Sequence, residues 1–233
     1  QDILSMTLPE LQAAVQELSE PKFRAKQIFN WLHQKRVTDF SEMTTLSLPF
    51  RERLASDFCI NRLKIAKRLA SSVDDTVKYL YELPDGNYVE TVCMQYHHGT
   101  SLCISTQVGC RMGCRFCASA IAGFVRNLTP AEMLLQIYET ERAQNCKISS
   151  LVLMGIGEPL DNFDNVLRFL QLLSDPNGYG MSLRHVTVST CGVVPKILEL
   201  AEQRLGLTLS VSLHCPNDAG RSAIMPINRS YPI

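Results

Sequence analysis

The stretch Cys103–Cys117, CISTQVGCRMGCRFC, places three thiols in one loop, because Cys110, Cys114 and Cys117 are separated by only three and two residues. Thiolates are soft ligands that suit an iron–sulfur cluster or zinc. A structural zinc site usually takes four ligands from two Cys or His pairs that lie well apart in the sequence, and no second pair occurs here. The spacing therefore favours a four-iron cluster in which one iron has no protein ligand, so that a small molecule can bind it through amino and carboxylate groups.

The composition is typical of a globular protein with one core and a small second domain, since 45% of the 233 residues are hydrophobic and 20% are charged. Apolar runs such as Leu151–Met154 are far shorter than the about 20 residues that cross a membrane. The first residues lack the basic-then-apolar order of a signal peptide. Nine scattered cysteines argue against a secreted disulfide framework. We therefore expect a cytoplasmic protein without membrane association.

The charges are balanced overall but unevenly distributed. Residues 1–72 carry 11 basic and 8 acidic side chains, whereas residues 73–233 carry 12 and 15. A polyanion would therefore meet the N-terminal part, notably the basic segment Arg62–Arg68, although a solvated basic face is the simpler explanation of such a cluster.

The first 61 residues predict a small domain of three short helices. Thr7 and Glu10 form a capping-box pattern before the first helix. In the second helix, apolar side chains recur on one side and basic ones on the other. Ser47, followed by Pro49, marks the start of the third. The residues expected to face inward from the second helix are Phe23, Ile28, Phe29 and Leu32.

Residues 62–100 change to strand-like alternation and predict a connector of β-hairpins. The segment Pro84–Asn87, with the sequence PDGN, is strong turn chemistry between two of these strands. The strands are expected at Lys64–Leu69, Thr76–Leu83 and Tyr88–Gln95.

Residues 101–233 alternate apolar strands with helices, which is the pattern of a parallel sheet covered by helices. A full eight-unit barrel takes about 250 residues, so this segment holds about four strand–helix units. The strands are expected at Ser101–Thr106, Leu151–Met154, Val186–Ser189 and Leu207–Leu213, and the helices at 130–143, 163–173 and 194–202. The predicted fold class is α/β, a partial barrel that is incomplete at its C-terminal end.

Chemically suggestive residues follow each of these strands. The first leads into the thiol loop, the second into Gly155–Pro159 (GIGEP), the third into Ser189–Gly192 and the fourth into Ser212–Pro216. Because the carboxyl ends of barrel strands meet at one face, we expect these segments to form one site. The two glycines of GIGEP would let the backbone approach a ligand, and Glu158 offers an acceptor for an ammonium group; an ordinary turn with a solvated glutamate is the alternative.

Together these motifs resemble those of radical S-adenosylmethionine (SAM) enzymes and, more narrowly, the family of dual-specificity RNA adenine-C2 methyltransferases, which act on 23S ribosomal RNA (rRNA) and transfer RNA (tRNA). The likeness covers nearly the whole chain and includes Lys22–Ile28 in the N-terminal part. The motifs that carry it are Cys103–Cys110, Phe124–Leu128, Met154–Leu160, Val188–Pro195 and Ser212–Asp218. The resemblance implies a six-unit partial barrel, a [4Fe-4S] cluster, SAM, an electron donor such as a flavodoxin-like reductase, and a monomer.

The resemblance also implies roles for individual residues. Cys110, Cys114 and Cys117 would bind the cluster, Cys103 would be the thiol that releases the product by closing a disulfide, and Glu90 would be the base that removes the C2 proton. The SAM pocket would be formed by Gly157, Glu158, Ser189, Ser212, Leu213 and His214. In the family, one SAM methylates a cysteine near the C-terminus, and chemistry supplied by the cluster and a second SAM moves this methyl group to adenine.

Contacts with RNA are expected from the N-terminal helices, which would form an RNA-binding accessory domain. Around the thiol loop, Arg111, Arg115 and Arg126 are expected to contact phosphates, and the target base must be unstacked to reach the mouth of a barrel.

The chain departs from the family at its C-terminal end. It stops at Tyr231-Pro-Ile233, after about four of the six strands, and Cys191 and Cys215 do not lie at the position of the methyl-carrying cysteine. We therefore expect these 233 residues, as a fragment of a longer protein or a truncated copy, to hold the cluster and part of the SAM site but to be unable to complete methyl transfer.

Two alternatives remain open from the sequence. One is a relative that methylates adenine at C8, which no residue here distinguishes from C2. The other is a non-catalytic iron–sulfur electron carrier or RNA-binding module. An electron carrier normally ligates every iron with protein groups, so a cluster that responds to SAM would favour the enzyme.

Overall fold

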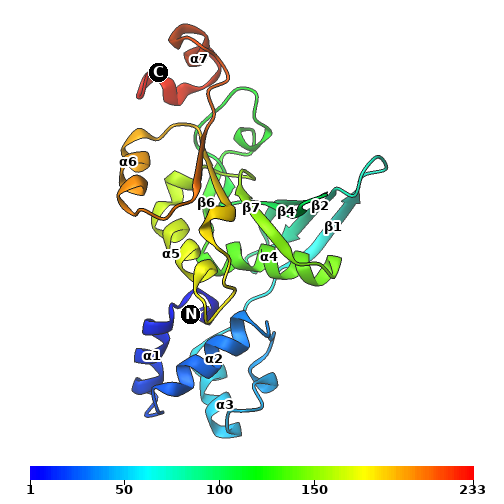
Figure 1. Cartoon of the computed structure of the whole chain (residues 1–233), viewed down its shortest axis with the longest axis vertical. Coiled ribbons are helices and arrows are strands. Elements are labelled where there is room, and N and C mark those ends of the chain that lie inside the picture. The colour runs from blue at the N-terminus through cyan, green and yellow to red at the C-terminus, as the bar shows by residue number, and fades with distance from the viewer.

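Three helices form an N-terminal unit that lies below the rest of the molecule in Figure 1. The computed structural model describes all 233 residues. The helices are α1 (Leu8–Glu17), α2 (Phe23–His33) and α3 (Leu48–Asp57). The predicted capping box is present at α1, where the Thr7 amide donates to Glu10 Oε2 over 2.8 Å. One side-chain prediction is wrong: Phe23 is 58% exposed, because it is the first residue of α2 and lies beneath the Arg24 guanidinium instead of in the core.

A seven-stranded sheet forms the rest of the framework, in the order β1-β2-β3-β4-β7-β8-β9. Its N-terminal half is antiparallel and consists of β1 (Lys64–Ala70), β2 (Val77–Glu82), β3 (Tyr88–Tyr96) and β4 (Gly99–Ile104). Its other half is parallel to β4 and consists of β7 (Ile148–Leu153), β8 (Val186–Thr190) and β9 (Thr208–Val211). The predicted hairpins therefore continue the sheet of the barrel, and the β1–β2 hairpin projects from the body in Figure 1.

Helices cover one face of the parallel half: α4 (Pro130–Gln144), α5 (Phe163–Ser174) and α6 (Val194–Glu202) each follow a strand (Figure 1). Leu102, Leu151 and Val188 point to this side and are fully buried. Their neighbours in the pleat, Cys103 and Val152, lie on the other face and are half-buried. The four parallel strands with their intervening helices agree with the predicted partial barrel.

Several short elements were not predicted. A separate two-stranded sheet pairs β5 (Gln107–Gly109) with β6 (Phe124–Asn127), and α7 (Asp218–Ile224) follows the last strand. The two strands have three and four residues and α7 has seven, which is too short for any of them to show a clear period. The structure also contains single-turn 3₁₀ helices at Ile3–Ser5, Phe40–Glu42, Ala118–Ala120, Pro159–Asn162, Leu183–His185 and Pro226–Arg229. None of the helices has the length and apolar character needed to span a membrane.

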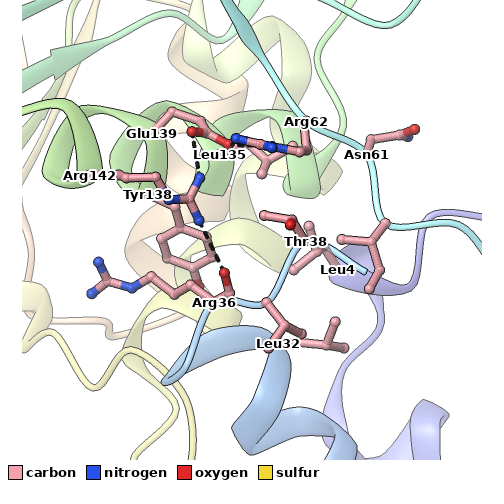
Figure 2. Close-up of a pocket in the computed structure, with 12 residues that line it drawn as sticks. Leu4, Leu32, Arg36, Thr38, Asn61, Arg62, Leu135, Tyr138, Glu139 and Arg142 are labelled. Atoms are coloured by element: carbon pink, nitrogen blue, oxygen red, sulfur yellow. Dashed lines mark hydrogen bonds and ion pairs between the residues drawn. The ribbon is translucent and has the colours of Figure 1, made fainter. Parts of the chain in front are cut away.

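The helical unit and the connector meet α4 at a network of charged side chains whose carboxylates are buried (Figure 2). Glu139 is buried and pairs with Arg142 over 2.6 Å and with Arg62 over 3.4 Å. Arg142 also donates to the backbone carbonyl of Arg36 over 3.1 Å, and Arg36 pairs with the buried Glu141. The cavity between these side chains has a volume of about 10 Å³, which is room for one water molecule and not for a ligand.

His33 is a buried titratable group at this interface. Its ring is fully buried, and its Nδ1 lies 2.9 Å from the Tyr138 hydroxyl on α4. Burial lowers the pKa of His33 from 6.5 to about 4. Above pH 6.5 the ring is neutral in both the folded and the unfolded chain. As the pH falls from 6.5 towards 4, the unfolded chain takes up the proton first, so the free energy of unfolding must decrease.

We expect this single group to remove on the order of 3 kcal/mol from the free energy of unfolding between pH 6.5 and pH 4. Urea denaturation at several pH values measures it, with His33→Gln as the non-titrating variant and His185→Gln, at an exposed position, as the control. The His33→Gln chain should show a flatter pH dependence than the other two chains. Equal slopes for all three would contradict a neutral buried imidazole.

Candidate functional site

A cavity of about 300 Å³ lies at the carboxyl ends of the parallel strands, where the sequence places its motifs. The thiol loop after β4 and the segments that follow β7, β8 and β9 all contribute to its wall. The residues that line it are Cys110, Met112, Cys114, Phe116, Cys117, Met154, Gly155, Gly157, Glu158, Ser189, Thr190, Cys191, Ser212, His214 and Met225. The expected convergence of four strand ends on one site is therefore present in the structure.

The thiol loop is closed at its base. β5 and β6 pair across it, and the Cys110 amide donates to the Gly123 carbonyl over 3.0 Å. Gly109 has φ +72°, and a Cβ atom there would overlap the Gly123 carbonyl oxygen, so only glycine fits this closure. The three thiols are half-buried, and burial raises the pKa of the Cys110 and Cys114 thiols. Binding a metal would therefore release protons from them.

The side chains of the site do not converge as a mononuclear metal site requires, since no three Cys, His, Asp or Glu side chains are placed to hold one metal ion. A zinc centre needs such convergence on a single point. A four-iron cluster instead offers separate iron atoms to separate thiolates. The three thiols on the wall of one cavity match the three protein ligands of such a cluster.

Gln107 ties the thiol loop to the segment after β7, and sequence reasoning missed it. Its side chain is fully buried, donates to Asp161 Oδ2 over 2.7 Å and accepts from the Glu158 amide over 2.8 Å. Asp161 in turn pairs with Arg111 of the thiol loop over 2.9 Å. These contacts join residues about 50 positions apart, and no periodic pattern in a sequence can reveal them.

Glu158 is a buried anion on the cavity wall without a cationic partner. Its side chain is 3% exposed, and it takes part in none of the ion pairs of the molecule. Oε1 accepts from the Leu160 amide over 3.0 Å, and Oε2 accepts from the Cys191 amide over 2.7 Å. Two oxygens provide about four acceptor positions, so the carboxylate can still accept from an ammonium group in the cavity. A buried charge of this kind is costly unless it is paired, which favours a cationic ligand.

Close packing of the backbone requires both glycines of the GIGEP segment, which the sequence alone did not reveal. A Cβ atom on Gly155 would lie 2.7 Å from the Ile104 backbone, and one on Gly157 would lie 2.6 Å from Gln107 Cβ. Gly157 also has φ +108°. Close packing of this turn on the start of the thiol loop therefore requires both glycines, whether or not a ligand approaches them.

The remaining residues predicted for the pocket divide into two groups. Ser189, Ser212 and His214 line the cavity, whereas Leu213 does not and is 47% exposed. His214 adopts φ +57°, and its ring centroid lies 4.6 Å from that of Phe116. Phe116 lies between two of the cysteines and was not predicted as a site residue, although its place in the motif was a usable signal.

Glu90 and Cys103 lie outside the cavity, on the face of the sheet that the helices leave uncovered. Cys103 is opposite Val92 of β3, and Glu90 is two residues from Val92, so both side chains share that face. The Glu90 carboxylate pairs with Lys78 over 2.6 Å. Burial raises the pKa of the Cys103 thiol. All nine cysteines of the chain are free thiols in the structure.

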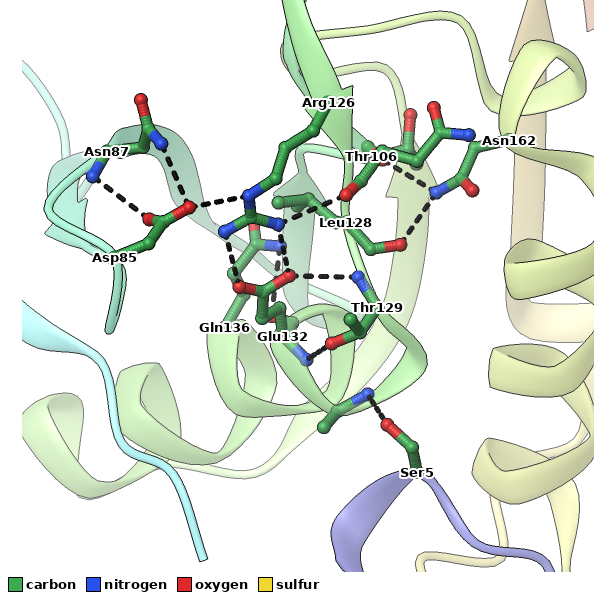
Figure 3. A network of polar contacts seen from close by, with 12 residues as sticks. Ser5, Asp85, Asn87, Thr106, Arg126, Leu128, Thr129, Glu132, Gln136 and Asn162 are labelled. Atoms are coloured by element: carbon green, nitrogen blue, oxygen red, sulfur yellow. Dashed lines mark hydrogen bonds and ion pairs between the residues drawn. The ribbon is translucent and has the colours of Figure 1, made fainter. Parts of the chain in front are cut away.

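Arg126 does not have the free guanidinium expected of a phosphate contact. It forms two hydrogen bonds of 2.8 Å with Glu132 at the start of α4 and one of 2.6 Å with Asp85 in the β2–β3 turn (Figure 3). These partners raise the pKa of Arg126 and lower that of Asp85. Arg111 is also paired, and of the three arginines only Arg115 is exposed without a side-chain partner. The sequence could not show that the first two arginines have internal acceptors.

Replacing Arg126 with methionine should reduce the free energy of unfolding by about 2–3 kcal/mol, because the buried Glu132 carboxylate would lose its bidentate partner. Arg115→Met, at an exposed position of the thiol loop, should change it by less than about 0.5 kcal/mol. Urea denaturation of the two variants makes the comparison. Similar stabilities would show that the Arg126 network contributes little.

The fold and the thiol loop define the class of protein. Residues 104–232 match the model of the Radical SAM superfamily, and residues 1–60 match that of the ribosomal RNA large subunit methyltransferase N-terminal domain. Proteins of this superfamily use a [4Fe-4S] cluster and SAM. The three thiols and the unpaired Glu158 fit those two groups.

Similarity to individual proteins identifies the family within this superfamily. The chain is 52% identical to the probable dual-specificity RNA methyltransferase RlmN of Lachnoclostridium phytofermentans and 48% identical to that of Clostridium novyi; the matches cover all of this chain and 65% and 68% of the relatives. A crystal structure of a radical SAM methyltransferase from Sphaerobacter thermophilus superimposes with a TM-score of 0.94 at 37% identity, covering all of this chain and 69% of that one. The chain therefore belongs to the RlmN family of radical SAM proteins, as its motifs predicted. It spans about two thirds of the length of these relatives.

Proposed function

We propose that these residues form the cofactor-binding part of an RNA methyltransferase that modifies C2 of an adenosine in rRNA and tRNA. The observation that carries the proposal is the single cavity in which three thiols face a buried, unpaired carboxylate at the ends of parallel strands. The names of the relatives, which describe dual-specificity RNA methyltransferases, support the substrate class. Because the relatives are longer than the region that matches, methyl transfer is proposed for a protein that has their full length.

The roles of the cavity residues follow from their chemistry. Cys110, Cys114 and Cys117 would hold the cluster, and Glu158 would accept the ammonium group of the methionine end of SAM. The further pocket residues would be Gly157, Ser189, Ser212 and His214, whereas Leu213 does not line the cavity. The bound cluster and SAM supply one-electron chemistry that an unactivated aromatic carbon requires.

We assign the proton transfer to Glu90 and the thiol step to Cys103, because both lie on the uncovered face of the sheet and the Cys103 thiol contacts the backbone of Met154, which lines the cavity. Lys78 would orient the Glu90 carboxylate through their 2.6 Å contact. The proton that leaves C2 would pass to a Glu90 oxygen. None of the nine cysteines is assigned the methyl-carrying role.

We propose a different role for each of three parts of the chain. Residues 1–61 would bind RNA, residues 101–233 would bind the cofactors, and residues 62–100 would connect these two parts. The limits of the matching family models, 1–60 and 104–232, support this division. On the projecting β1, Lys67 and Arg68 are exposed and unpaired, so they are free to contact phosphates.

We further propose a monomer in the cytoplasm that receives electrons from a flavodoxin-like reductase.

Anaerobic reconstitution followed by titration with SAM tests the proposal. We expect about four irons and four sulfides per chain and a reduced cluster whose electron paramagnetic resonance (EPR) spectrum changes when SAM is added. A cluster that ignores SAM would favour the electron-carrier alternative. With a full-length relative as the enzyme, chromatography of the product nucleoside against authentic standards separates C2 from C8 methylation, since the two products have the same mass.

A further inference from the structure

The geometry points to Arg221 of α7 as a positioning residue that fixes the wall of the cavity without touching the ligand. Its side chain is 4% exposed and does not line the cavity. Nη2 donates to the Cys191 carbonyl over 2.7 Å and to the Ser212 carbonyl over 3.1 Å, and Nε donates to the Leu213 carbonyl over 3.2 Å. One guanidinium therefore holds the segments that follow two different strands, β8 and β9.

Arg221 has no carboxylate partner, which sets it apart from an ordinary buried ion pair. Its remaining side-chain contact is Nη1 to Asn228 Oδ1, over 2.6 Å, and it takes part in none of the ion pairs of the molecule. A buried cation satisfied only by neutral acceptors is expensive to desolvate. What the chain gains is geometric, because the rigid, planar fork of a guanidinium fixes the carbonyls that it binds relative to one another.

The backbone of Cys191 connects this cation to the buried anion of the site. Its amide donates to Glu158 Oε2 over 2.7 Å, while its carbonyl accepts from Arg221 over the same distance. Gly192, with φ +105°, leaves space at this point, since a Cβ atom there would lie 3.3 Å from Arg221 Nη2. The segments after β7, β8 and β9 are thus linked through one residue that is held between two opposite charges.

This link has a specific consequence for ligand binding, which rests on the proposed function for the identity of the ligand. Without Arg221, the carbonyls of Cys191, Ser212 and Leu213 lose their donor, and the wall that contains Ser212 and His214 loses its fixed position. Glu158 also loses the constraint on its Cys191 partner. The base of the thiol loop is closed at Gly109 and Gly123, which Arg221 does not contact, and the loop meets α7 through the backbone, where the Arg115 amide donates to the Ile224 carbonyl over 2.9 Å, so the iron content should be retained.

Hydrogen–deuterium exchange and SAM affinity test the inference in the 233-residue chain. The variants are Arg221→Met, Arg221→Lys and, as a control, Arg229→Met at an exposed position in the same segment. In the metal-free chain, Arg221→Met should speed exchange in residues 189–193 and 212–216 by about tenfold or more, with α4 unchanged. In the reconstituted chain, its SAM dissociation constant, read from the EPR change, should rise about 10- to 100-fold at unchanged iron content.

Arg221→Lys should recover part of both effects, because an ammonium group keeps the charge and some donors but lacks the planar fork. Arg229→Met should behave as the unmodified chain. Unaltered exchange in the two segments of Arg221→Met, or exchange that is faster throughout the molecule, would overturn the positioning role. If SAM leaves the EPR spectrum of the unmodified chain unchanged, the proposed function fails, and the exchange measurement alone decides the role of Arg221.

Discussion

A chain in which Cys114 is replaced by serine should fail to hold the iron–sulfur cluster. The thiol loop offers three thiolates to the cluster, so replacing one cysteine leaves two. A serine oxygen is a hard ligand that binds iron–sulfur clusters poorly. Cys114 is only half-buried, so the fold should persist. Iron and sulfide analysis after anaerobic reconstitution should fall from about four of each per chain to less than about one.

Cys59→Ser provides the matched control, because Cys59 is an exposed thiol in the helical unit and lines no part of the cavity. It should retain the full iron content. The assignment of the thiol loop as the cluster site would be wrong if the Cys114→Ser chain kept its iron. Its circular dichroism spectrum should be like that of the control in this comparison.

Replacing Glu158 with glutamine should weaken SAM binding by about 10- to 100-fold, since a hydrogen bond to a charged group contributes roughly 1.5–3 kcal/mol. Glutamine has nearly the same shape and keeps one acceptor oxygen for the backbone amides of Leu160 or Cys191. It removes the negative charge that faces the cavity and leaves one of the two backbone amides without its acceptor. Titration of the reconstituted chain with SAM, followed by EPR, measures the dissociation constant.

Glu199→Gln is the control for this change, because Glu199 pairs with Lys196 on the exposed side of α6 and such surface pairs contribute little. The iron content of both variants should match that of the unmodified chain. An unchanged SAM affinity in Glu158→Gln would mean that the carboxylate serves only the two backbone amides.

The features that sequence analysis predicted are those with a long pattern or a distinctive spacing. The parallel strands and their helices came from continuous apolar runs, and α6 lies at the residues expected for it, Val194–Glu202. The cavity was predicted because Cys110, Glu158 and Ser212 follow different strands of one sheet. Their common position is a property of the topology, which the alternation of strands and helices already implies.

The features that escaped prediction depend on single polar contacts between distant residues. Gln107, Arg126 and Arg221 are polar residues in short segments, and a solvated position is the ordinary expectation for such residues. Whether a guanidinium meets a phosphate or an internal carboxylate depends on which turn lies beside it, as Arg126 and Asp85 show. The same limit applies to Glu158, whose two backbone partners became visible only in the structure.

The closure of the thiol loop between Gly109 and Gly123 also affects how the iron–sulfur cluster is inserted and how a damaged cluster is replaced. A loop whose ends are already joined loses less entropy when its interior becomes ordered around a ligand than an open segment of the same length would. The three half-buried thiols lie on a cavity wall and not in the core, so iron can enter or leave while the sheet and its helices remain intact. Damage by oxygen would then be a local event, and a folded chain could receive a new cluster without refolding.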